Sequence, residues 1–107
     1  MANVAFRLNA SAGPSVRIDY SIPNFAYKNW YHYAAVFDDE LDEMRLYVNG
    51  EEVGSQPCRR SVATGYVINV IGNWRGRGER SWRGLIDDVL IFNQALDSAD
   101  IELLYLR

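Results

Sequence analysis

The sequence predicts an all-β, antiparallel β-sandwich with one short helix at its carboxy end. Apolar and polar residues alternate with a period of two along most of the 107 residues, as in half-buried strands. The pair Asn49-Gly50 separates two such stretches, and a period of 3.6 is found only in the last residues. This length fits one domain, and we expect a single domain over residues 1–107.

The first strands are predicted on either side of a Gly-Pro turn. Val4 to Asn9 alternates before Gly13-Pro14, and Val16 to Ser21 alternates after it. The next stretch, Tyr31 to Phe37, is apolar on both faces. We therefore expect it inside the sandwich rather than at an edge.

A hairpin follows, because Met44 to Val48 alternates and stops at Asn49-Gly50. Both central residues of a type I′ turn need positive φ, which Asn and Gly tolerate. A return strand is expected from Glu51, and Tyr66–Ile71 and Leu85–Phe92 bring the expected number of strands to six or seven.

The carboxy-terminal stretch DSADIELLYL predicts a helix. Asp97 can cap its first turn, and Asp100 stands three residues later, in the spacing of a capping box. Ile101, Leu104 and Tyr105 then share one face.

Charge is unevenly distributed along a chain with a net charge of −3. Residues 38–52 hold seven acids against Arg45, whereas residues 58–83 hold six arginines against Glu79. Cys58 is the single cysteine, so no disulfide forms within the chain, and we expect a structural free thiol. No apolar run is long enough to span a membrane, and the first residues lack the apolar core of a signal peptide.

Three segments together resemble a known family. WYHYAAVFDDELDEMRLYVNGEEV, then VIGN, then WRGLIDDVLIFNQALDSADIELLY are similar to the second half of a concanavalin A-like jelly roll of the laminin-G-like type, over Trp30 to Leu106. The resemblance implies a two-sheet jelly roll. It also implies a module that binds carbohydrate or protein within larger, secreted or cell-surface proteins, with enzymes a minority.

Members of such families carry several strands before the position of Val4, and this sequence has no residues for them. We expect a truncated jelly roll with bare strand edges. Either the chain is a fragment, or two copies complete each other as a homodimer, which makes self-assembly the alternative function.

Catalytic residues are not expected. His32 is the single histidine, no nucleophile elbow accompanies it, and we expect it to be packed. The run DDELDE invites comparison with the E-x-D-x-x-E strand of jelly-roll glycosidases, but Arg45 stands where the second Glu should be. The chain is therefore predicted not to be an enzyme, and the acidic run is predicted to be a solvated turn.

Asp87 and Asp88 fall inside the predicted strand Leu85–Phe92, among apolar neighbours. Buried carboxylates need a cation or hydrogen-bond donors. The resemblance implies that an acid at this place can help to bind a structural calcium ion. An arginine or a backbone amide is the alternative partner, because calcium needs six to eight oxygen ligands.

The stretch NWRGRGERSWRG, Asn73 to Gly84, is the strongest candidate binding loop. The resemblance places it at the rim of the jelly roll, where loops carry specificity. The predicted ligand-binding residues are Trp74, Arg75, Arg77 and Arg80. Carbohydrate or protein is the expected partner, and Trp82 is expected in the core or at its margin. The arginines can instead pair with the chain's own acids. Nucleic acid is disfavoured, because the sequence pI is near 5.0 and the acidic segment would repel it.

Overall fold

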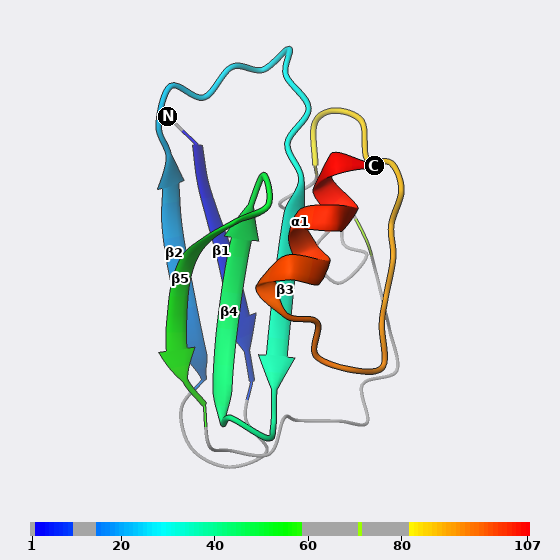
Figure 1. Ribbon diagram of the computed structural model, residues 1–107. Coiled ribbons are helices and arrows are strands. Elements are labelled where there is room, and N and C mark those ends of the chain that lie inside the picture. The colour runs from blue at the N-terminus through cyan, green and yellow to red at the C-terminus, as the bar shows by residue number, and fades with distance from the viewer. Residues whose placement is uncertain (1, 10–14, 59–70, 72–81) are drawn as a thin grey trace.

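The computed structural model describes residues 2–9, 15–58, 71 and 82–107. Within them the chain is mostly β, with antiparallel sheets and one carboxy-terminal helix, as predicted (Figure 1). The elements in chain order are β1 (Ala2–Leu8), β2 (Val16–Ile22), β3 (Tyr33–Asp38), β4 (Glu43–Val48), β5 (Glu51–Pro57) and α1 (Ser98–Leu106).

The first two strands form an antiparallel sheet of their own. Their register runs from Ala2 opposite Ile22 to Leu8 opposite Val16, which confirms both predicted strands. The Tyr33 hydroxyl donates to the Ala5 carbonyl at 2.7 Å. This hydrogen bond links β1 to β3, the first strand of the second sheet.

The second sheet has the order β3-β4-β5. Asn49 and Gly50 form the β4–β5 turn with φ of 52° and 78°, as a type I′ turn requires, so the predicted hairpin is confirmed. The predicted acidic turn is also present between β3 and β4. There the Asp38 carboxylate accepts hydrogen bonds from the backbone N–H groups of Glu40 and Leu41, both at 3.1 Å.

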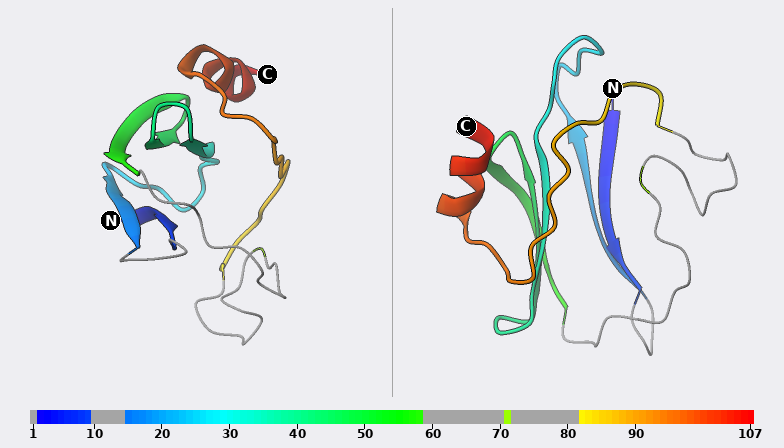
Figure 2. Two further views of the ribbon diagram at one scale, coloured as in Figure 1. Left: turned by 90° about the horizontal axis from the view of Figure 1, so that it is seen from below. Right: turned by 90° about the vertical axis from the view of Figure 1, so that its right-hand side faces the viewer.

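Strand β4 separates two clusters of buried side chains. Met44 and Leu46 pack toward the β1–β2 sheet, with Ile18 and Cys58, so the single thiol is a core residue as expected. Tyr47 packs on the other side, with Val36 of β3 and Ile101 of α1. Figure 2 shows the β1–β2 sheet and the helix on opposite sides of the three-stranded sheet. Burial of Met44 and Leu46 stabilises the fold by about 2 kcal/mol each.

Helix α1 begins as predicted. The Asp97 side chain accepts from the Asp100 N–H, and the Asp100 side chain accepts from the Asp97 N–H, which completes a capping box. Ile101 is buried and Leu104 is half-buried against the sheet. Tyr105 lies more exposed, with its ring near His32.

Arg45 joins the helix to the sheet from a buried position on β4. Its guanidinium lies 3.3 Å from carboxylate oxygens of Asp38 and Glu43, and it donates to the Leu96 carbonyl at 3.1 Å. Its Nε donates to the Tyr47 hydroxyl at 3.1 Å. The buried cation is therefore fully paired, which is the condition for tolerating it in a core.

One prediction about a strand was wrong. Residues 85–92 form no strand, and Asp88 interrupts them with a φ of 57°, in the left-handed region. Their apolar side chains are exposed, because no strand pairs with this stretch in the described part of the chain. Among the described strands β3 pairs with β4 alone, so its expected place inside a sandwich stays a prediction.

The complete two-sheet jelly roll is not seen among the described residues, which hold a two-stranded and a three-stranded sheet. The strand predicted at Tyr66–Ile71 lies outside the described residues except for Ile71 itself.

Candidate ligand-binding site

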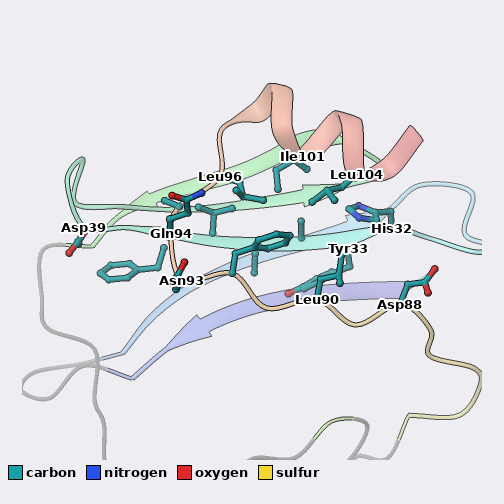
Figure 3. Close-up of a pocket in the computed structure, with 16 residues that line it drawn as sticks. His32, Tyr33, Asp39, Asp88, Leu90, Asn93, Gln94, Leu96, Ile101 and Leu104 are labelled. Atoms are coloured by element: carbon teal, nitrogen blue, oxygen red, sulfur yellow. The ribbon is translucent and has the colours of Figure 1, made fainter. Parts of the chain in front are cut away.

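A groove runs along the edge of β3 that no described strand pairs with, between β3 and residues 88–96, and we name it the β3 groove (Figure 3). Its volume is about 660 Å³. Tyr33, Leu90 and Phe92 contribute apolar surface to it. Its polar side chains are His32, Asp39, Asp88, Asn93 and Gln94.

The polar side chains are spread along the length of the groove. Figure 3 shows His32 and Asp88 at one end, and Asp39 with Asn93 and Gln94 toward the other. Within the described chain, β3 pairs only with β4, so its outer edge also presents backbone N–H and C=O groups. The groove thus combines amide donors and acceptors, carboxylate acceptors and apolar surface.

His32 stands just before β3, where Asn49 of the β4–β5 turn holds its backbone. Its N–H donates to the Asn49 side-chain carbonyl at 2.8 Å, and its carbonyl accepts from the Asn49 N–H at 2.8 Å. Its ring lies 5.9 Å from that of Tyr105. Its Nδ1 atom is buried and has no hydrogen-bond partner among the described residues.

The protonation of His32 follows from this environment. Burial lowers the pKa of the imidazole, and the nearby positive charge of Arg107 lowers that pKa further. The ring is therefore neutral near pH 7, with one nitrogen able to donate and the other to accept. The half-buried ring agrees with the prediction of a packed histidine.

Asp87 and Asp88 do not have the buried environment that the sequence predicted. Both are exposed, and the Asp87 carboxylate accepts a hydrogen bond from the Asp88 N–H at 2.8 Å. The reason is that the strand expected to bury them does not form. In the described part of the chain, no three His, Cys, Asp or Glu side chains gather as metal ligands, and calcium at this pair stays a prediction.

The predicted binding loop falls largely outside the described residues, and this holds for Trp74, Arg75, Arg77 and Arg80. Trp82 is described, and its predicted burial was wrong. It is 60% exposed, and its indole N–H donates to the Leu85 carbonyl at 3.2 Å. The unpaired stretch that follows provides no core into which the indole could pack.

Asn93 and Gln94 were missed by the sequence analysis. They lie between the predicted strand and the helix, where polar residues are ordinary, so no signal marked them. Only their position across from β3 makes them candidates.

These features define a small antiparallel β-sheet domain with a groove at a sheet edge. The chain belongs to the Concanavalin A-like lectin/glucanases superfamily, since a laminin-G-type family model from it matches residues 2–102. The match begins well before Trp30, where the resemblance seen in the sequence began, so the β1–β2 sheet is part of the family fold.

One solved structure is similar in both sequence and fold. It is an S-layer domain-containing protein from Clostridium thermocellum, residues 221–444, with a TM-score of 0.55 and 25% identity. The alignment covers 96% of this chain and 51% of that chain, so this chain spans about half its length. No curated protein matches the sequence significantly. No helix in the described ranges is long and apolar enough to cross a membrane.

Proposed function

We propose that this chain is a non-catalytic recognition domain that binds carbohydrate in the β3 groove. The observation that carries the proposal is the lining of the groove, which brings amide and carboxylate side chains together with ring and aliphatic surface. A saccharide presents hydroxyl groups at its rim and C–H groups on its faces. The groove offers a partner for each of these.

The amides of Asn93 and Gln94 suit sugar hydroxyls especially well. Each amide has one acceptor oxygen and two N–H donors, and a hydroxyl both donates and accepts. Neither amide has a hydrogen-bond partner in the described part of the chain, so ligand binding would cost them no internal bond. Membership of a superfamily that includes lectins supports the same ligand class.

The arrangement of the acids supports recognition rather than hydrolysis. A glycosidase places two carboxyl groups about 5–10 Å apart on either side of one bond. The acids that line the described groove are Asp39 and Asp88, and Figure 3 places them at opposite ends. The superfamily also includes glucanases. The separation of Asp39 from Asp88 is therefore the argument for binding rather than hydrolysis.

The test is isothermal titration calorimetry with a panel of neutral and acidic oligosaccharides. The double variant Asn93→Ala/Gln94→Ala should weaken binding at least tenfold, because it removes the amides from the groove. Gln56→Ala is the matched control, since it truncates an exposed amide on β5, at the opposite edge of the sheet. A folded chain that binds none of the panel contradicts the proposal.

A second candidate function is self-assembly into a homodimer. It is favoured by the exposed apolar side chains of residues 85–92 beside a free β3 edge, since such edges pair with other strands. Light scattering should then report a dimer, and Ile91→Lys should convert it to a monomer, because Ile91 is 90% exposed. A monodisperse wild-type monomer contradicts this candidate.

A further inference from the structure

The β2–β3 connection, residues 23–32, carries an aromatic surface that the β3 groove does not use. Its ten residues, PNFAYKNWYH, include four aromatic side chains. Tyr27 is 93% exposed and Trp30 is 64% exposed, so most of the surface of each side chain lies in solvent. Tyr27 and Trp30 stand three positions apart in one connection, and large exposed rings grouped in this way are typical of recognition surfaces.

Ring contacts within the connection hold Tyr27 in place. Phe25 stacks on Tyr31, with ring centroids 5.1 Å apart and planes at 20°. The ring of Tyr27 meets Phe25 edge to face, also at 5.1 Å. The exposed Tyr27 thus contacts the half-buried ring of Phe25, which in turn stacks on the half-buried Tyr31.

Backbone hydrogen bonds set the shape of the same connection. The Ala26 N–H donates to the Tyr31 hydroxyl at 3.0 Å, and the Asn29 N–H donates to the Ala26 carbonyl at 3.1 Å. The second bond closes a turn that puts Tyr27 and Lys28 at its corner. A surface that is ordered before binding loses little entropy when a ligand arrives.

The connection also lies next to the groove. It ends at His32, which lines the groove at the end shown with Asp88 in Figure 3. In Figure 1 the connection rises beyond the upper end of β3, so the groove leads toward it. A ligand lying along the β3 groove and extending past His32 would meet this surface.

The side chains between the rings indicate the class of ligand. Asn24, Lys28 and Asn29 are exposed, and residues 23–32 include no Leu, Ile, Val or Met. Ring faces flanked by amides and an ammonium match the C–H face and the hydroxyl rim of a sugar. Lysine is depleted in protein–protein interfaces, so the exposed Lys28 among these rings favours a sugar over a protein partner.

We infer that Tyr27 and Trp30 form a stacking platform for a sugar ring, which extends the β3 groove so that one oligosaccharide chain occupies both. This inference rests on the proposed carbohydrate-binding function and adds a second place of contact to it. The amides of Asn24 and Asn29 and the ammonium of Lys28 would hold the hydroxyl or carboxylate groups of the stacked sugar.

The experiment is calorimetric titration of the wild type and variants with those oligosaccharides of the panel that the wild type binds. Tyr27→Ala and Trp30→Ala should each weaken binding at least tenfold. Tyr27→Phe keeps the ring and should bind within twofold of the wild type. Trp82→Ala removes a similarly exposed tryptophan from another segment and should bind as the wild type does. Thermal unfolding of each variant confirms that it is folded.

The possible results separate the two proposals. If the Asn93→Ala/Gln94→Ala variant loses affinity and the Tyr27 and Trp30 variants do not, the platform is overturned and carbohydrate binding stands. If the Tyr27 and Trp30 variants lose affinity, the platform is supported. If the folded wild type binds no oligosaccharide, carbohydrate binding fails and the platform fails with it.

Discussion

Asn49 and His32 are joined by two hydrogen bonds, although Asn49 lies in the β4–β5 turn and His32 ends the β2–β3 connection. The Asn49 side-chain oxygen accepts from the His32 N–H, and the Asn49 N–H donates to the His32 carbonyl, both at 2.8 Å. Asn49 is also the first corner of the β4–β5 turn, with a φ of 52°. One residue therefore shapes the hairpin and fixes the point where the aromatic connection enters β3.

Variants at Asn49 separate these two roles. Asn49→Ala should lower the free energy of unfolding by about 2 kcal/mol, because it loses the side-chain acceptor. It also places alanine at a positive φ, which alanine tolerates less well than asparagine does. Asn49→Gly loses the acceptor alone and should cost about 1 kcal/mol or less. Urea unfolding measures both. If both variants lower the free energy of unfolding equally, the positive φ at position 49 does not contribute to the loss.

His32 makes stability depend on pH. Because burial and then Arg107 lower its pKa in the folded chain, the unfolded state binds the proton more readily. The free energy of unfolding should therefore fall as the pH drops through about 6.5, the ordinary value for histidine, and level off below the folded pKa.

Urea unfolding at pH 7.5 and pH 5.5 tests this, with His32→Gln as the variant that cannot titrate. That variant should show a smaller difference between the two conditions. The pKa of Asp38 is also lowered, chiefly by the hydrogen bond from the Leu41 N–H and also by Arg45. Asp38 changes the free energy of unfolding only below about pH 4, which is outside the range measured here. An unchanged pH dependence in His32→Gln would refute the assignment.

The Tyr47 hydroxyl links β4 to the first residue of α1 by a hydrogen bond. It accepts from Arg45 Nε and shares a hydrogen bond with Ser98 Oγ, each at 3.1 Å, from a fully buried side chain. Tyr47→Phe should cost about 1–2 kcal/mol, since it leaves the Arg45 Nε without its partner.

A double-mutant cycle of Tyr47→Phe with Ser98→Ala should give a coupling of about 0.5–1 kcal/mol. Tyr20→Phe is the control, because the Tyr20 hydroxyl makes no hydrogen bond in the described part of the chain and the change should be nearly neutral. Strict additivity of Tyr47 and Ser98 would show that their contact contributes nothing.

Gly54 sets how closely β5 approaches β2. A Cβ atom at this position would lie 2.6 Å from Cγ2 of Ile18, a core atom with little room to move. Gly54→Ala should therefore cost about 1–3 kcal/mol, and Ile18→Ala in the same chain should reduce that cost. Chemical denaturation of the two single variants and the double variant measures this. Ser55→Ala, at an exposed neighbour, should have almost no effect.

The elements that the sequence predicted well are those specified by neighbours along the chain. The Asn49-Gly50 turn and the Asp97 capping box depend on residues within a few positions, and both are present. The alternation of β4 likewise predicted which side chains share a face. The surroundings of the candidate site were predicted less well, because Trp82 was assigned to the core and Asp87 to a buried strand, and both are exposed.

The sequence by itself determined the hairpins, the helix with its cap, and the laminin-G-like family, because local backbone preferences and the period of the pattern are written in consecutive residues. Only the tertiary structure decided that residues 85–92 stay unpaired, that Asn93 and Gln94 face β3 across a groove, and that Tyr27 stands in solvent. Each of these depends on which partner lies opposite a strand or a ring, and a partner distant along the chain leaves no mark in the local pattern.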